Sequence, residues 1–360
     1  MKILILICAI LFYFGGCYGQ NKHVNVQVDE RLELLCTVEL LSDKSPELSA
    51  NTYYKREVEA TFKPFKSHPA VSFVTSMIDS EICNGSSLIW YLYQCSFPGF
   101  KLEGNILADE CQIENYSKHL EALAQLRGLL QDFYTKSHFH TFYLKHKKLY
   151  DSICKPMTNY VSKVAIIDSM EKYYNQKKQG YYIILSPLIH PGGVGIQVHR
   201  NTGDYIYGII GPEFMSKTTP IFPTEISFQY IVIHEFSHSF CNSIIHKNFS
   251  RLNVDSCLAD TLVSVNEHVR LYYGGDWETC LFELFTRANE IVLCKKVLGS
   301  EKAKETYYKY YNENRWIFLD GLVPLIENEY LNNRKKYVNL EYFMPKIIDY
   351  FDEEKIKYCH

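Results

Sequence analysis

Two histidines four residues apart, His234 and His238, constrain this chain more than any other feature of its sequence. They follow apolar residues at helical spacing, Phe228, Ile231 and Val232, so we expect them to lie on a helix. On a helix, residues four apart share a face, and both imidazoles can then reach one metal ion. The alternative is an amphipathic helix whose histidines are ordinary core or surface residues. A metal explains better why an apolar helix would bury two histidines and a glutamate, because it compensates for their desolvation.

The residue after the first histidine, Glu235, completes an HExxH pattern. It lies about 100° around the helix from His234, close enough to act on a metal-activated water without being a ligand. Zinc suits the histidine pair because imidazole is a borderline ligand and zinc is redox-inert. The pattern therefore predicts a zinc site in which Glu235 is the general base.

A catalytic zinc also needs a third protein ligand and an open position for water. The next strongly apolar segment with helical spacing is Trp277–Glu290, and Glu283 lies within it. Arg287 and Glu290 share the face of Glu283. We favour Glu283 as the ligand, with Glu278 and Glu290 as alternatives, and a plain ion pair between Glu283 and Arg287 as the competing interpretation. If Glu283 is the ligand, Arg287 or Glu290 would orient the ligands.

The histidine pair followed by a glutamate on a downstream helix resembles the gluzincin clan of zinc metallopeptidases. More narrowly, the chain is similar to an uncharacterised family of secreted bacterial zincin-like proteins, a domain of unknown function with an HEFSH core. The resemblance covers most of residues 28–290 and is carried by Arg31–Leu35, Phe65–Val71, Gly192–Gly195, Gly211–Pro212, His234–Phe240 and Glu283–Ala288. It implies a zincin fold, the ligands His234, His238 and Glu283, and Glu235 as base. It implies no particular substrate.

Three strand candidates precede the histidine helix. Tyr181–Leu185 is an apolar run, Val194–His199 alternates between apolar and polar residues, and Tyr205–Ile210 follows a turn signal. Their order along the chain predicts a small antiparallel meander.

The residues at the start of the second strand, Gly193, Val194 and Gly195, form a candidate substrate edge. Glycines allow another backbone to approach closely, so this edge could pair with an extended peptide by strand addition. A plain tight turn explains the same glycines equally well.

A segment between the two predicted helices holds candidate transition-state stabilisers. His268, Tyr272 and Tyr273 could each donate a hydrogen bond to an oxyanion. None stands out, because the chain contains 29 tyrosines and such side chains are common in it.

The expected fold class is α+β, with a zincin-like arrangement. Residues 20–155 should form a helical region, and residues 156–360 a metal-binding region with the small sheet, the histidine helix and a helical C-terminal part. We expect the two regions to form one compact unit. Three polar residues are candidate helix N-caps, namely Ser117 before the leucine-rich segment 120–133, Thr224 before the histidine helix and Asp276 before the Glu283 helix.

Residues 1–19 are typical of a secretory signal, because Lys2 precedes an apolar run, Ile3–Phe14, that is too short to span a bilayer. The segment 15–17 resembles a bacterial lipobox, which would leave Cys17 as a lipidated N-terminus. Cleavage before Gln20 is the alternative. Both predict export to the periplasm, the cell surface or the medium, with membrane attachment only through a lipid on Cys17.

Charge and cysteine content further limit the classes of partner and fold that the sequence allows. The formal net charge is −3 and no basic block is present, which argues against nucleic acid as a partner. Of 12 cysteines, Cys8 and Cys17 lie in the targeting segment, and the spacing of the others matches no compact disulfide scaffold. Cys241, on the histidine helix, is expected to be a buried and unreactive thiol.

We therefore expect an exported, zinc-dependent metallopeptidase-type hydrolase with a peptide or protein substrate. Two other classes stay open. One is an exported binding protein with a structural or vestigial zinc, and the other is a zinc amidase acting on non-peptide or cell-wall material. The sequence does not indicate subsite specificity, a propeptide or the oligomeric state.

Overall fold

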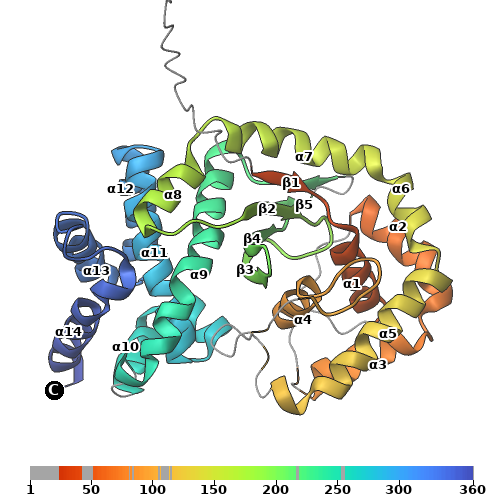
Figure 1. The fold of residues 1–360 in the computed structure, drawn as a ribbon, viewed down its shortest axis with the longest axis horizontal. Helices are drawn as coiled ribbons and strands as arrows, with labels where there is room; N and C mark the ends of the chain where they lie inside the picture. Colours follow the sequence, from red (N-terminus) through yellow and green to blue (C-terminus); the bar gives the residue numbers. More distant parts are fainter. Residues whose placement is uncertain are drawn as a thin grey trace, which may run out of the picture.

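The computed structural model describes residues 24–42, 52–80, 82, 85–103, 106, 113, 116–215, 219–252 and 256–359. Helices dominate, and a small sheet lies between an N-terminal group of helices and a group formed by the later part of the chain (Figure 1). This arrangement confirms the expected α+β class with helical N-terminal and C-terminal parts. The predicted targeting segment, including Cys17 and the cleavage site before Gln20, lies outside the described residues. No helix among the described ranges is both long and apolar enough to cross a membrane.

The helices follow the apolar periodicity of the sequence. The N-terminal group contains α1 (Glu30–Leu41), α2 (Tyr53–Phe62), α3 (Pro69–Asp79), α4 (Gly85–Tyr93), α5 (Leu120–Lys136), α6 (Phe139–Lys145) and α7 (Lys147–Ser162). The later group contains α8 (Ile166–Tyr174), α9 (Glu225–Leu252), α10 (Ser256–Val265), α11 (Trp277–Val297), α12 (Ser300–Tyr308), α13 (Leu319–Leu325) and α14 (Leu340–Cys359). Short π-helical turns occur at η4 (Val269–Tyr273), η5 (Lys309–Glu313) and η6 (Ile326–Tyr330).

The predicted caps have different outcomes. Asp276 caps α11, because its side chain accepts hydrogen bonds from the backbone N–H groups of Glu278 and Thr279. Thr224 immediately precedes α9, and its carbonyl accepts from the Phe228 N–H at 2.7 Å. The prediction for Ser117 is wrong. It lies in a 3-10 turn, Tyr116–Lys118, and α5 begins without a side-chain cap.

The sheet has four strands in the order β1 (Asn25–Gln27), β2 (Gly180–Leu185), β4 (Gly203–Ile210) and β3 (Gly193–Arg200). The three predicted strands are present, but the predicted antiparallel meander is wrong. Only β3 and β4 pair antiparallel, whereas β2 runs parallel to both β1 and β4.

The reason for this mixed sheet is the path of the chain after β2. The chain reverses direction to form β3 at the far edge, then turns again at Gly203, whose φ of 125° suits glycine. Strand β4 therefore runs in the direction of β2 and inserts beside it. Alternation along each strand predicts which face is buried, but it carries no information about strand order. A two-stranded ribbon, β5 (Phe214–Met215) with β6 (Pro220–Ile221), follows.

The pairing of β1 with β2 joins the N-terminal region, residues 20–155, to the region that follows it. Val26 lies opposite Ile183 in parallel register, so residues from both sides of position 155 share one sheet. Residues of the core come from both regions, including Leu32 and Val38 of α1 and Phe236 of α9.

A disulfide between Cys257 and Cys359 joins α10 to α14. Cys241 is buried as expected, and burial raises the pKa of its thiol to about 12. The free cysteines among the described residues are Cys36, Cys95, Cys154, Cys241, Cys280 and Cys294.

A buried carboxyl, Glu33 of α1, ties three parts of the fold together. One of its oxygens accepts from Ser186 Oγ at 2.6 Å, after β2, and the other accepts from the Tyr54 hydroxyl at 2.8 Å, on α2. The Tyr54 hydroxyl also bonds that of Tyr150, on α7, at 2.7 Å. Burial raises the pKa of Glu33 to about 7, against the opposing effect of its Ser186 and Tyr54 hydrogen bonds.

This raised pKa predicts a pH-dependent stability. Because the folded state binds the Glu33 proton more tightly than the unfolded chain, the free energy of unfolding should fall as pH rises from about 4.5 to about 7. The contribution is roughly 3 kcal/mol at most. Urea unfolding of wild type and Glu33→Gln at pH 5 and pH 8 should show a smaller pH effect in the variant. An equal pH effect in both, with exposed Glu305→Gln as control, would contradict this account.

Candidate metal centre

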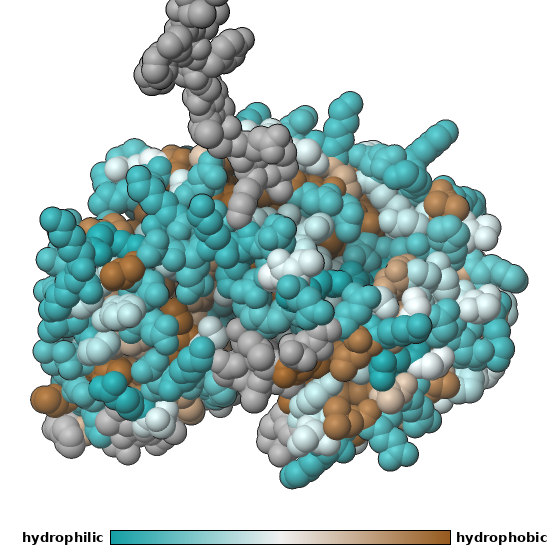
Figure 2. All heavy atoms as spheres, in the orientation of Figure 1, coloured by the Kyte–Doolittle hydropathy of each residue, from teal (hydrophilic) through white to brown (hydrophobic). Residues whose placement is uncertain are grey.

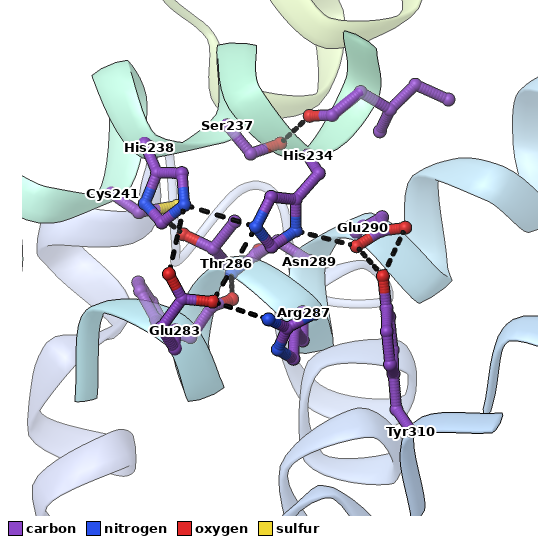
Figure 3. Close-up of polar contacts among 12 residues, drawn as sticks. His234, Ser237, His238, Cys241, Glu283, Thr286, Arg287, Asn289, Glu290 and Tyr310 are labelled. Carbon is purple, nitrogen blue, oxygen red and sulfur yellow. Dashed lines mark hydrogen bonds and ion pairs between the residues drawn. The ribbon is translucent and has the colours of Figure 1, made fainter. Parts of the chain in front are cut away.

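His234, His238 and Glu283 come together between α9 and α11, with ligand atoms that all lie within 4.8 Å of one another. The Nε2 atoms of the two histidines are 3.2 Å apart. The two carboxylate oxygens of Glu283 lie 3.6 Å from His234 Nε2 and 3.5 Å from His238 Nε2 (Figure 3). The three side chains therefore converge on one point, as the sequence predicted.

Each histidine has its other ring nitrogen engaged on the side away from this point. His234 Nδ1 lies 2.9 Å from Glu290 Oε2. His238 Nδ1 lies 3.1 Å from Asn242 Oδ1 and 3.2 Å from Thr286 Oγ1. A proton on Nδ1 leaves the lone pair on Nε2, so both rings are oriented to offer Nε2 to a cation. Two imidazole nitrogens and a carboxylate are a donor set that fits zinc.

Glu290, one of the two alternative ligands, contacts Nδ1 of His234, on the side of that ring away from the point where His234, His238 and Glu283 converge. Its carboxyl is fully buried and accepts from the Tyr310 hydroxyl at 3.0 and 3.1 Å (Figure 3). Burial raises the pKa of Glu290 to about 8, with Arg287 opposing the shift. The other alternative, Glu278, lies against His246 Nδ1 at 2.6 Å.

Glu283 is in an ion pair with Arg287 as well as beside the histidines. Arg287 donates to Glu283 Oε2 at 2.7 Å. Burial opposes ionisation of Glu283, but Arg287, followed by His238 and His234, lowers the pKa of this carboxyl to about 2. The two interpretations of Glu283, metal ligand and partner of Arg287, are thus compatible in one geometry.

Glu235 is buried on the face of α9 that packs against the sheet, next to β3. A Cβ added at Gly193 would overlap the Glu235 carboxylate, and one added at Gly195 would overlap the Glu235 backbone carbonyl. Burial raises the pKa of Glu235 well above its usual range, and a hydrogen bond from the Gly195 backbone opposes that rise. The glycines of β3 are therefore required for the helix and strand to approach this closely.

The candidate transition-state stabilisers lie on and just before η4. His268 Nε2 is 3.2 Å from the Tyr273 hydroxyl, and Arg287 and Glu283 influence the pKa values of both. Tyr272 packs against the His268 ring but leaves 71% of its surface exposed. His268 and Tyr273 therefore lie close enough to Glu283 and Arg287 to interact with them electrostatically, whereas Tyr272 is mostly exposed.

Four residues around the centre were not identified from the sequence. Asn242 and Thr286 lie one helical turn from His238 and Glu283, so helical spacing could have indicated them. Tyr310 and Trp316, whose rings lie against Arg287, come from the helical C-terminal part of the chain. No local pattern marks them.

Comparison with known proteins places this geometry in a family without an assigned activity. A domain of unknown function, DUF4932, matches residues 24–350. The chain belongs to the DUF4932 family. The match continues well past residue 290, where the resemblance described above ends. No curated protein and no solved structure matches the chain. Membership of DUF4932 therefore assigns no reaction to the centre.

The contacts of β3 with α9 predict a large cost for one glycine substitution and a small cost for another in this DUF4932 protein. Gly195→Ala should lower the free energy of unfolding by about 3 kcal/mol, because the added methyl meets backbone that cannot move independently. Gly193→Ala should cost less than about 1 kcal/mol, because the Glu235 side chain can swing away. Urea unfolding of both variants measures the difference. Equal costs would show that the strand and helix do not approach as described.

Proposed function

We propose that this DUF4932 protein is an exported, zinc-dependent hydrolase of the metallopeptidase type. The observation that carries the proposal is the convergence of His234, His238 and Glu283 beside a buried, separate carboxyl, Glu235. The resemblance to gluzincins and the HExxH pattern support the same assignment. The Cys257–Cys359 disulfide supports export, because disulfides persist mainly in oxidising compartments.

Zinc would be held by the Nε2 atoms of His234 and His238 and by the carboxylate of Glu283. When bound there, it would make a water molecule more acidic and polarise the carbonyl of a substrate. Glu290, Asn242 and Thr286 would hold the two imidazole rings in the orientation that binding requires.

Glu235 would move the proton in this mechanism. It would take a proton from the attacking water and later pass it to the leaving amine. A buried carboxylate binds a proton more tightly than an exposed one, which suits the first of these transfers. Gly193 and Gly195 let β3 lie directly against Glu235. His268 Nε2 and the Tyr273 hydroxyl, which lie 3.2 Å from each other, would donate to the oxygen on which negative charge develops.

A peptide substrate would lie along β3. This strand is at the end of the sheet, and Gly193 and Gly195, on either side of Val194, lie beside Glu235. Further along, the Gln197 carbonyl accepts from Gln94 at 3.3 Å, so α4 and the residue after it cover that end of the edge. An extended backbone added at the first residues of β3 would come directly to the general base.

The alternative of a binding protein with a structural zinc is less well supported. Structural zinc sites are almost always closed by four protein ligands. Within the part of the chain that the structure describes, this cluster contains three. Hydrolysis needs a buried carboxyl beside the metal that is not itself a ligand, such as Glu235, and a structural site does not.

Replacing the general base tests the proposal. Glu235→Gln should keep zinc at one ion per chain but cleave a peptide library at least about 100-fold more slowly than wild type, because the proton acceptor is lost. Zinc by elemental analysis and cleavage by mass spectrometry give the two readouts. Glu305→Gln, at an exposed site, is the matched control.

Two results would contradict this assignment. Equal cleavage by wild type and Glu235→Gln would remove the role of Glu235. Cleavage of cell-wall fragments, with peptides left intact, would show that the protein is a zinc amidase and not a peptidase.

A further inference from the structure

Arg287 is a buried cation in direct contact with a residue that we propose as a metal ligand. Its guanidinium donates to Glu283 Oε2 at 2.7 Å, and only 13% of its side chain is exposed. A permanently positive group is unexpected so close to a cation site, because it repels the ion that the site must bind.

The surroundings of Arg287 hold it in this position. The Tyr310 ring centroid lies 4.6 Å from the guanidinium carbon and the Trp316 centroid lies 4.8 Å from it. Aromatic faces attract a guanidinium, and both rings come from the chain after α12. Two other acids, Glu290 and Glu235, interact electrostatically with this cation. Glu290 accepts from Tyr310, and its side chain is directed to His234 Nδ1 (Figure 3). The chain after α12 thus holds the Arg287 guanidinium next to the proposed zinc ligands.

We propose that Arg287 neutralises Glu283, so that the three proposed zinc ligands and Arg287 together carry no net charge and less of the positive charge of the ion is offset by its ligands. This inference rests on the proposed function. With both imidazoles neutral, Glu283 contributes −1 and Arg287 contributes +1, which sum to zero. The centre then behaves electrostatically like one built from three neutral ligands, in which a bound carbonyl oxygen experiences a stronger field.

A purely structural role for Arg287 makes the opposite prediction about affinity. If Arg287 only orients Glu283, its removal leaves the carboxylate less well placed and zinc binds more weakly. If Arg287 acts through its charge, its removal leaves an uncompensated carboxylate and zinc binds more tightly. The sign of the change therefore separates the two roles.

The experiment measures the zinc affinity of the full chain by competition with a chromophoric chelator. Arg287→Met should bind zinc about tenfold more tightly than wild type, and Arg287→Lys, which keeps the charge, should stay within about threefold. Arg334→Met is the matched control, because Arg334 lies over the Tyr330 ring at 4.3 Å and contacts none of the proposed ligands. Unchanged or weaker binding in folded Arg287→Met would overturn the inference.

A double substitution keeps the test decisive if Arg287→Met does not fold. Removing both buried charges avoids leaving either unpaired, so Glu283→Gln with Arg287→Met should fold more readily than Arg287→Met alone. The double variant should bind zinc more tightly than Glu283→Gln alone, in which Arg287 is left uncompensated. Equal or weaker binding by the double variant would reject the charge role. Absence of zinc binding in wild type would instead reject the proposed function.

Discussion

The contact between α9 and α11 is the interaction on which the rest of the structure depends. It brings two imidazoles and carboxyls from Glu283 and Glu290 into an interior where each unpaired charge would be costly. The cost is offset because each group has a partner. Arg287 forms an ion pair with Glu283, the Tyr310 hydroxyl donates to Glu290, and Glu290 also accepts a hydrogen bond from His234 Nδ1. Such a cluster tolerates little change, because removing one partner leaves another buried and unsatisfied.

The sheet fixes the distance between α9 and β3. Gly193 and Gly195 let the Glu235 segment of α9 lie directly on β3, and Gly208 of β4 lies against Phe236 in the same way. Because β3 is both the strand in contact with Glu235 and the last strand of the sheet, the proposed general base lies next to an edge strand. The parallel pairing of β1 and β2 extends this support into the N-terminal helices (Figure 1). Figure 2 shows a largely hydrophilic surface over both groups of helices, interrupted by smaller apolar areas.

Local sequence patterns predicted the helices, the three strands of residues 181–210 and the three converging side chains, but not the contacts that depend only on tertiary packing. The spacing of His234 and His238 and the buried face of α11 predicted the three converging side chains, because helical geometry follows from short-range periodicity. The order of the strands could not be read, since alternation is the same for an antiparallel meander and for the mixed sheet that forms. Tyr310 and Trp316 were also missed. They reach Arg287 through tertiary packing, which no spacing encodes.

The central claim is that one zinc ion is held by two imidazoles and one carboxylate, with no sulfur ligand. X-ray absorption at the zinc edge of the zinc-loaded wild-type protein tests it most directly, because this measurement distinguishes nitrogen and oxygen from sulfur and detects imidazole rings. The account predicts nitrogen and oxygen ligands at about 2.0–2.1 Å, including two imidazoles. A sulfur ligand at about 2.3 Å, or a single imidazole, would contradict it.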